Sequence, residues 1–373
     1  MKILQLGKFY PIRGGVEKVM WDLTDGLSAR GVLCDMLCAV LPGERPDGGT
    51  IVLNPSGRVI CVPAACKLAA TMISPAMVRW LRTHRSDYDI VHVHHPDPMA
   101  CLALRLSGFR GKVVLHWHSD ILKQKTLLRL YKPLQSWLIR RADLIVGTTP
   151  VYVAESPFLA KVQDKVRCLP IGILPVNGTA GPKSGDDREV TVFSLGRLVG
   201  YKGFEYLIDA ARCLPPNYKI AIAGDGPLRD SLQARIDAAG LGGRVILLGW
   251  ISDRQKMDWY RRCNVFCLSS IWKTEAFAIV QIEAMSCGRP VVATRIPGSG
   301  VPWVNEHGVS GLNVPVCDAK ALADAILAVT SDSDVYAAFC AAAKKRYETC
   351  FTLDRMISGC VSLYQELLDE NEN

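Results

Sequence analysis

The stretch that decides the fold is Thr274-Glu-Ala-Phe-Ala-Ile-Val-Gln-Ile-Glu-Ala-Met-Ser-Cys-Gly-Arg-Pro-Val-Val-Ala-Thr294. Glu275 and Glu283 flank a short apolar run, which ends at Gly288 before a strand-like Pro290-Val-Val-Ala. The spacing predicts a helix that starts near Glu275 and carries Glu283 about two turns in, roughly 12 Å away along the axis. The N-terminus of such a helix favours phosphates. A ligand with two hydroxylated rings joined by a diphosphate would fit the spacing between the two glutamates. The alternative is that both glutamates are solvated on an amphipathic helix.

The composition indicates a globular protein of two domains. The 373 residues exceed one ordinary domain, and the hydrophobic content of 49% excludes a disordered chain. No apolar run reaches the ~18 residues of a membrane-spanning helix, and the first seven residues predict a strand instead of a signal peptide. The 14 cysteines contain no CxxC pair, so we interpret them as buried, reduced thiols of a cytoplasmic protein.

The net charge of +8 is concentrated in the first half of the chain. Residues 1–172 carry 23 Lys and Arg against 13 Asp and Glu, whereas residues 173–373 carry 21 against 23. This asymmetry predicts an anionic partner for the first half: acidic lipid, a diphosphate-linked acceptor or nucleic acid. Segment 123–141 combines six cations and no acid with Leu, Tyr and Trp. That mixture favours a membrane interface or an anionic lipid-linked acceptor, and a core helix with a basic outer face is the alternative.

Predicted strands and helices alternate along both halves, which is typical of doubly wound α/β domains. The first half has predicted strands at 1–6, 32–40, 90–94, 112–117, 144–147 and 165–169. A linker rich in Gly and Pro at 170–188 precedes strands at 190–195, 218–223, 245–248, 265–268 and 290–293. We therefore expect two Rossmann-like domains that face a cleft: 1–172, with a C-terminal helix of about 352–373, and 173–351.

Candidate phosphate-binding residues follow the first strand of each predicted domain. Gly14 and Gly15 open the first helix, where paired glycines let a diphosphate approach the backbone, and an ordinary turn is the alternative. Arg197 and Lys202 lie in a glycine-containing loop after the strand at 190–195. Two cations there would neutralise a departing diphosphate, and a solvated basic loop is the alternative.

Histidines mark the ends of two neighbouring strands in the first half. His118 follows the strand at 112–117 and would project into the cleft, where it could stabilise a developing positive charge or position an acceptor. His92, His94 and His95 lie near the end of the strand at 90–94. Alternating histidines raise the possibility of a metal, but only Asp97 accompanies them as a carboxylate, so we predict no metal site.

Together these residues resemble glycosyltransferase family 4, retaining enzymes of the two-domain GT-B fold. The likeness covers nearly the whole chain and rests on Glu-x7-Glu, here Glu275 to Glu283, followed by Ala-Met-Ser-Cys-Gly-Arg-Pro-Val-Val-Ala. It also rests on four features in family order: Gly14-Gly15, His118, Arg197 and Lys202.

The resemblance implies a donor site and a catalytic set. The donor site would comprise Gly14, Gly15, Arg197, Lys202, Glu275, Phe277, Ala278, Ile279 and Glu283. The catalytic set would comprise His118, Arg197, Lys202 and Glu275. Glu275 would bind the donor sugar, Glu283 the ribose, and the two cations the diphosphate. Ala278 stands where many family members have glycine.

A closer likeness is to O-polysaccharide mannosyltransferases, whose acceptor-side segment resembles residues 118–125 and 130–135. It implies transfer of mannose from GDP-mannose to a polyprenyl-diphosphate-linked glycan in lipopolysaccharide O-antigen synthesis, peripheral on the inner face of the cytoplasmic membrane. No cofactor, metal or nucleic acid would be required. The acceptor or the anionic membrane would be met by Lys123, Lys125, Arg129 and Lys132. A UDP-sugar donor, a UDP-sugar epimerase or glycan phosphorylase, and a catalytically silent binding protein are the alternatives.

Overall fold

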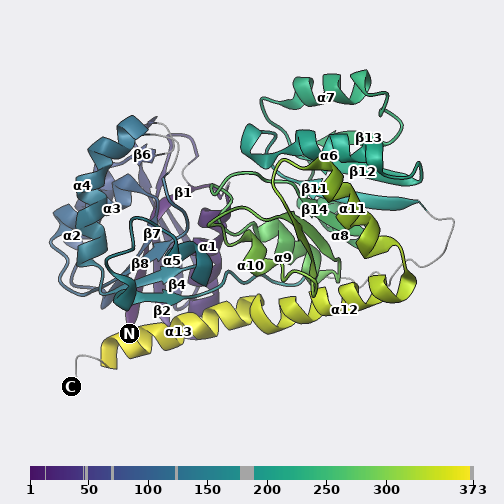
Figure 1. Ribbon diagram of the computed structural model, residues 1–373. Helices are drawn as coiled ribbons and strands as arrows, with labels where there is room; N and C mark the ends of the chain where they lie inside the picture. Colours follow the sequence, from purple (N-terminus) through teal and green to yellow (C-terminus); the bar gives the residue numbers. More distant parts are fainter. Residues whose placement is uncertain are drawn as a thin grey trace. The chain divides into compact units, whose positions relative to one another are not determined.

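The chain divides into two compact units, and each is described by itself. Unit 1 comprises Met1–Gly172 and Leu353–Asn373, and unit 2 comprises Ile173–Thr352. The structure is a computed structural model that describes residues 1–12, 14–44, 46, 49–68, 71–121, 125–176 and 189–369 (Figure 1). Most of the predicted linker at 170–188 lies outside the described residues. Each unit is an α/β layer in which helices pack on both faces of one main sheet.

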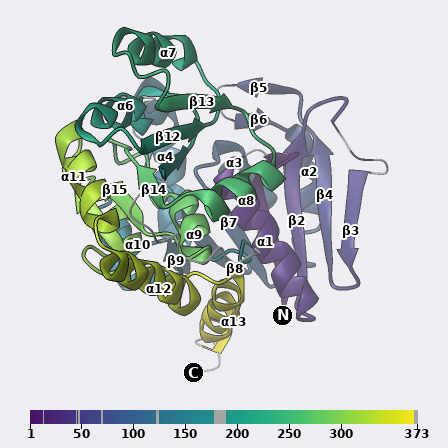
Figure 2. The same cartoon turned by 90° about the vertical axis from the view of Figure 1, so that its right-hand side faces the viewer.

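Unit 1 is built on an eight-stranded sheet with the order β10-β9-β8-β7-β1-β2-β4-β3. The strands are β1 (Lys2–Tyr10), β2 (Leu33–Val40), β3 (Thr50–Asn54), β4 (Gly57–Pro63), β7 (Ile90–His95), β8 (Lys112–Trp117), β9 (Leu144–Gly147) and β10 (Val166–Cys168). All pairs are parallel except β3 with β4. The expected parallel sheet therefore needs one correction, because a tight turn between Asn54 and Gly57 reverses the chain at the outer edge (Figure 2). A separate hairpin joins β5 (Cys66–Leu68) to β6 (Thr71–Ile73).

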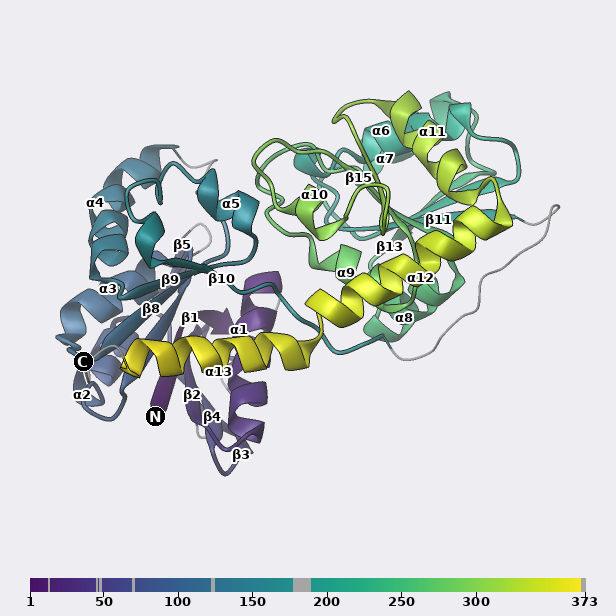
Figure 3. The same ribbon diagram turned by 60° about the horizontal axis from the view of Figure 1, so that its bottom comes forward.

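The helices of unit 1 are fixed by local caps and by close packing. They are α1 (Gly15–Ala29), α2 (Pro75–Thr83), α3 (Pro98–Ser107), α4 (Lys125–Arg141), α5 (Pro150–Ala154) and α13 (Leu353–Asp369). The carboxylate of Asp97 caps α3 by accepting from two backbone N–H groups. Helix α13 runs beside α1 (Figure 3), where a Cβ on Gly26 would lie 2.6 Å from Ile357, so the glycine permits the contact.

Unit 2 is built on a six-stranded, fully parallel sheet with the order β13-β12-β11-β14-β15-β16. The strands are β11 (Val190–Leu195), β12 (Tyr218–Ala223), β13 (Val245–Gly249), β14 (Val265–Leu268), β15 (Val291–Thr294) and β16 (Gly311–Val314). The helices are α6 (Phe204–Ala210), α7 (Arg229–Ala238), α8 (Asp253–Arg262), α9 (Ile279–Ser286), α10 (Val301–Val304), α11 (Ala319–Thr330) and α12 (Ser333–Cys350). A buried hydrophobic cluster packs against this sheet. Because all strand pairs are parallel, the carboxyl ends of the strands lie at one edge.

Gly224 brings the ends of β11 and β12 together. Its φ is +125°, and a Cβ at this position would lie 2.0 Å from the carbonyl oxygen of Gly196. Only glycine can adopt this backbone conformation and leave that space free. The loop that follows β11 is thereby held against the end of β12, and this loop carries Arg197 and Lys202.

Candidate active site

A buried ion pair lies at the carboxyl edge of the unit 2 sheet. Lys202 Nζ is 2.5 Å from Glu275 Oε2, and the side chains of the two residues are 10% and 12% exposed. Ser270 Oγ donates to the same carboxylate oxygen at 2.9 Å. Burial by itself lowers the pKa of Lys202, but the neighbouring Glu275 carboxylate and Tyr201 together outweigh it, so the pKa is raised and the ammonium stays charged. The structure thus brings two predicted site residues together across 73 positions of sequence.

Arg197 occupies the same loop as Lys202 but has a different environment. Its side chain is exposed, and within the described part of the chain it forms no ion pair. The stem of Lys202 packs on Gly196, where a Cβ would lie 3.1 Å from Lys202 Cε. The loop therefore offers one buried cation and one exposed cation to a ligand at the edge of the sheet.

The segment that joins Glu275 to Glu283 differs from the expected single helix. Helix α9 begins at Ile279, four residues after Glu275, and Glu283 lies only in its second turn. The helix begins there because Ala278 has a left-handed backbone with φ +61°. The estimate of two helical turns between the two glutamates is therefore wrong, since residues 275–278 precede the helix.

The N-terminus of α9 has no side-chain cap. Ala278 is the N-cap and provides no side-chain hydrogen bond to the helix. The backbone N–H groups of Phe277, Ala278 and Ile279 donate to no other residue among those described. Free amides at a helix N-terminus bind anions, so the three predicted positions have the chemistry that a phosphate requires.

Glu283 is held by two residues of α8 that the sequence did not single out. Lys256 Nζ is 2.9 Å from Glu283 Oε1, and Tyr260 Oη donates to Oε2 at 2.7 Å. Burial raises the pKa of Tyr260 well above its usual range, and the Glu283 carboxylate adds to this, so the phenol remains a donor. Two donors fix the carboxylate and leave it with further lone pairs for a hydroxyl. Lys256 and Tyr260 are spaced one helical turn apart, and this spacing could have indicated that both lie on the same face of a helix.

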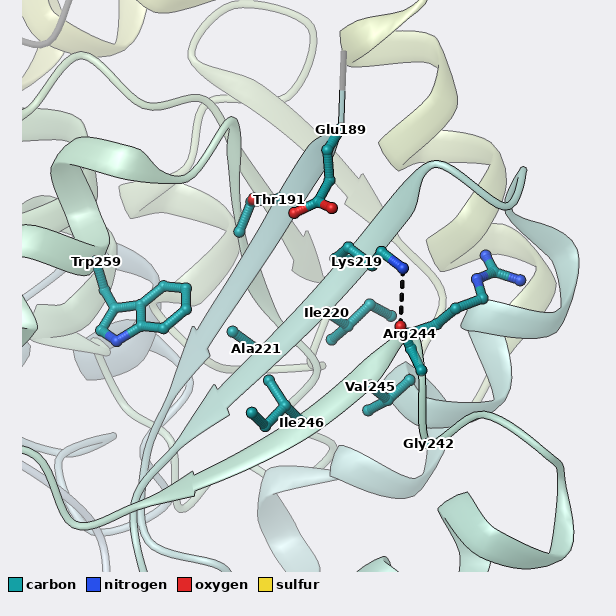
Figure 4. Close-up of a pocket in the computed structure, with 11 residues that line it drawn as sticks. Glu189, Thr191, Lys219, Ile220, Ala221, Gly242, Arg244, Val245, Ile246 and Trp259 are labelled. Carbon is teal, nitrogen blue, oxygen red and sulfur yellow. Dashed lines mark hydrogen bonds between the residues drawn. The ribbon is translucent and has the colours of Figure 1, made fainter. Parts of the chain in front are cut away.

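A hollow of about 260 Å³ on unit 2 is not this site (Figure 4). It is lined by the amino-terminal halves of β11, β12 and β13, including Thr191, Lys219 and Ile246, with Trp259 at one side. Lys219 Nζ donates to the carbonyl oxygen of Gly243 at 2.8 Å. Ligands of doubly wound sheets bind beyond the carboxyl ends of the strands, and this hollow lies toward the other end.

In unit 1, Gly14 and Gly15 begin α1 as predicted. Gly14 is the N-cap, with an extended backbone at φ −144°, and Gly15 is the first helical residue. A Cβ on Gly14 would lie 2.4 Å from Glu17 Oε2, so the carboxylate of Glu17 fills the space of a side chain at this position. Packing against Glu17 therefore also explains why a glycine occupies this position, besides the predicted binding of a ligand.

His118 belongs to a stack of four imidazoles on one face of the unit 1 sheet. His92 and His94 lie on β7, His116 on β8, and His118 follows β8. The rings of His116 and His118 are 4.0 Å apart, and those of His94 and His118 are 5.2 Å apart. Burial lowers the pKa of His116 to about 3 and the pKa values of the other three well below their usual range. The strand-end position of His118 agrees with its prediction, whereas His92 and His94 lie within β7.

Three of these histidines also form a candidate metal cluster. One nitrogen each from His92, His94 and His116 lies within 4.8 Å of the others. Tetrahedral zinc with Zn–N bonds of about 2.0–2.1 Å would bring its ligands to about 3.4 Å from one another. The rings are stacked nearly parallel, so their lone pairs do not converge, and both nitrogens of His94 are in hydrogen bonds. As arranged, the cluster is a stack and not a coordination shell.

The predicted acceptor or membrane residues lie on or before α4. Arg129 and Lys132 are exposed, together with Leu130, which is 78% exposed. Lys125 begins α4, and Lys123 lies outside the described residues. On α3, the guanidinium of Arg105 stacks over Trp137 of α4 at 5.1 Å.

No single helix among those described has the length and apolar composition to cross a membrane. Helices α11 and α12 satisfy the criterion only when joined, and they are bent by 98°.

Comparisons with known proteins show the family to which the chain belongs. Residues 13–173 match Glycosyltransferase Family 4, and residues 181–346 match Glycosyl transferases group 1. The chain is 30% identical over 377 residues to the O-antigen chain mannosyltransferase C of Escherichia coli, with 99% of each chain covered. It is 29% identical to a D-rhamnosyltransferase of Pseudomonas aeruginosa, with 87% of this chain and 86% of that one covered.

Solved structures with the same fold are more distant in sequence. The sucrose-phosphate synthase of Thermosynechococcus elongatus superposes with a TM-score of 0.78 at 21% identity, covering 99% of this chain and 100% of that one. The HepE protein of Anabaena, in complex with UDP, superposes with a TM-score of 0.75 at 20% identity, covering 98% and 100%. At this identity the likeness concerns the fold alone.

Proposed function

Because the chain belongs to glycosyltransferase family 4 and has the GT-B fold, we propose that it moves mannose from GDP-mannose to a polyprenyl-diphosphate-linked glycan with retention of configuration. The observation that carries the donor part is the buried Lys202–Glu275 pair at the carboxyl edge of the unit 2 sheet. An ammonium kept charged in a partly dry site neutralises a diphosphate more strongly than one in water. The mannosyl and O-antigen assignment is supported by the names of the relatives.

We assign the donor to unit 2. The sugar, the ribose and the diphosphate of the donor are each assigned to different residues of this unit. Glu275 accepts hydroxyls of the sugar, and Glu283, fixed by Tyr260, accepts a hydroxyl of the ribose. The diphosphate lies at the N-terminus of α9, beside Lys202 and the exposed Arg197. Lys202 bridges the carboxylate and the phosphate, so the departing charge meets a cation that is already in place.

The proposed reaction uses these groups as follows. As the bond between the sugar and the diphosphate breaks, positive charge develops on the sugar and negative charge on the phosphate. Lys202 and Arg197 stabilise the phosphate, and His118 of unit 1 contacts the sugar near the reacting carbon. The acceptor hydroxyl attacks from the face that the diphosphate leaves, which retains the configuration. Gly14 and Gly15 are proposed to contact the diphosphate. The proposed reaction uses no metal ion or other cofactor.

The donor assignment is tested with purified protein and a panel of nucleotide sugars. GDP-mannose should raise the melting temperature more than UDP- or dTDP-sugars, because a ligand that binds only the folded state stabilises it. Radiolabel from GDP-mannose should then appear in a polyprenyl-diphosphate acceptor, and the anomeric coupling of the product reports retention. If a UDP-sugar gave the larger rise in melting temperature and was transferred, the donor would be a UDP-sugar and not GDP-mannose. If the sugar was epimerised and not transferred, the protein would be an epimerase and not a transferase.

Two substitutions test the assigned cation. Lys202→Met should lower transfer about 100-fold or more, because one charge contact to a developing anion is worth about 3 kcal/mol. Lys219→Met is the matched control, since its ammonium donates to a carbonyl of its own unit at the opposite end of the strands. Equal activity of Lys202→Met and wild type would remove Lys202 from the site.

The membrane-facing segment is proposed to be the exposed, basic part of α4. Arg129 and Lys132 flank the exposed Leu130, so the surface presents both charge and apolar area to an anionic bilayer. Flotation with phosphatidylglycerol vesicles should be lost in the variant with Arg129→Glu and Lys132→Glu, and it should weaken at high salt. Lys320→Glu, an exposed charge change on unit 2, is the control. Equal flotation of all three proteins would refute this surface.

A further inference from the structure

A chain of hydrogen bonds connects His118 to the core of unit 1 and to α13. His118 Nε2 lies 2.9 Å from His94 Nδ1, and His94 Nε2 lies 2.8 Å from Gln5 Oε1. Gln5 Nε2 donates to Tyr364 Oη at 3.0 Å, and this hydroxyl lies 2.5 Å from His92 Nδ1. Every member is at most 5% exposed, so water does not compete for these contacts.

The amide of Gln5 determines the direction of each bond in this chain. Because burial lowers the pKa of both His94 and His118 well below the usual range, each ring is neutral and carries one proton. An amide oxygen can only accept, so His94 donates from Nε2 and its Nδ1 is a bare lone pair. That lone pair accepts from His118, which therefore carries its proton on Nε2 and leaves Nδ1 bare.

We propose that Gln5 and His94 are positioning residues that hold His118 as its Nε2–H tautomer, so that its Nδ1 accepts a hydrogen bond from a hydroxyl of the sugar. This inference rests on the proposed function, in which His118 contacts the donor sugar. A hydroxyl that donates to the ring gains electron density on its oxygen, which favours the positive charge developing at the reacting carbon. The opposite tautomer would present an N–H group and withdraw that density.

His116 offers a matched control within the same stack. Its ring lies 4.0 Å from that of His118 and is fully buried. Neither of its nitrogens has a hydrogen-bond partner in the described part of the chain. Replacing His116 by Phe therefore preserves the stacking and removes no bond to His118, whereas His94→Phe preserves the stacking and removes the acceptor.

The tautomer is measured directly, without activity, by long-range ¹H–¹⁵N correlation spectra of the full-length protein labelled at its seven histidines. In the wild type the bare nitrogen of His118 should be Nδ1. His94→Phe and Gln5→Met should both convert His118 to a mixture of tautomers. Gln5→Glu keeps an acceptor for His94 and should retain the wild-type pattern, as should His116→Phe. Protonation of His118 on Nδ1 in the wild type, or an unchanged pattern in His94→Phe, would overturn the inference.

Turnover gives the second readout. His94→Phe should lower kcat about tenfold with the KM for the donor within about twofold, because the contact tightens only as charge develops. His116→Phe should stay within about twofold in both constants. If no donor is transferred, the proposed function fails and the tautomer result still stands. If transfer occurs but the tautomer differs, the proposed function stands and this inference fails.

Discussion

Lowering the pH from about 7.5 to about 5.5 should destabilise unit 1, because five buried histidines cannot bind protons while it stays folded. Burial lowers the pKa values of His95 and His116 to about 3 and those of His92, His94 and His118 well below the usual range. In the unfolded chain each has a pKa near 6.5. Their contribution to stability is therefore fully present above about 6.5 and is lost as the pH falls below it.

The size of this loss follows from proton binding to the unfolded chain. Over this interval an unfolded histidine goes from about one-tenth to about nine-tenths protonated, which favours unfolding by about 1.4 kcal/mol. The five together give about 7 kcal/mol, as large as the total stability of many domains, which is about 5–15 kcal/mol. Unit 2 contains none of these five histidines, so its unfolding free energy should change much less over the same interval.

Urea unfolding at both pH values, followed in each unit by hydrogen-exchange mass spectrometry, measures the effect. The variant His116→Phe should remain folded and lose about 1.4 kcal/mol less than the wild type over the same interval. A change below about 2 kcal/mol in the unfolding free energy of unit 1 would refute the reasoning. It would mean that the histidines are protonated or hydrated in the folded state.

Three further predictions concern unit 2, each measured by urea unfolding. Glu275→Ala leaves Lys202 buried without its carboxylate and should lower the free energy of unfolding by about 3 kcal/mol. The double variant Glu275→Leu with Lys202→Met should recover most of this loss. Additive losses would contradict the pairing. Gly224→Ala should cost at least about 3 kcal/mol because its Cβ would lie 2.0 Å from a carbonyl oxygen, whereas Gly200→Ala, with open space around it, should stay within about 0.5 kcal/mol. Ala278→Gly should change stability by less than about 0.5 kcal/mol, since relief at φ +61° is offset by a looser unfolded chain, while Ala278→Val should lose at least about 1 kcal/mol.

The central strands are the part of the fold that the sequence predicts best. The predicted bounds of β8, β9, β11, β12 and β14 coincide with the observed ones. These strands are short runs of apolar, often β-branched residues, which are buried in a parallel sheet. The strands β3, β4, β5, β6 and β16 were not predicted. Of these, β3 and β16 lie at sheet edges, and β5 and β6 form a separate hairpin. The apolar run of β4, Val59-Ile-Cys-Val62, was an available signal that the prediction missed.

The candidate site was predictable as a set of residues but not as an arrangement. The start of α9 depends on the left-handed backbone of Ala278. The sequence pattern predicted a continuous helix through this residue. The Lys202–Glu275 pair depends on packing between loops that are distant in the chain. Gln5 did carry a signal, since it is the one polar residue among Ile3, Leu4 and Leu6 in a buried strand. The sequence analysis assigned the C-terminal helix to the first domain, but no pattern indicated that Tyr364 of this helix would accept a hydrogen bond from Gln5.

The return of α13 to unit 1 has a consequence for how the protein is made. Gln5 donates a hydrogen bond to Tyr364, so the core of unit 1 joins a segment that precedes unit 2 in the sequence to a segment that follows it. Unit 2, in contrast, is one continuous segment, Ile173–Thr352, and is complete as soon as it emerges. Unit 2 can therefore fold before unit 1, although most of unit 1 is translated first, because unit 1 needs a helix that follows unit 2 in the sequence.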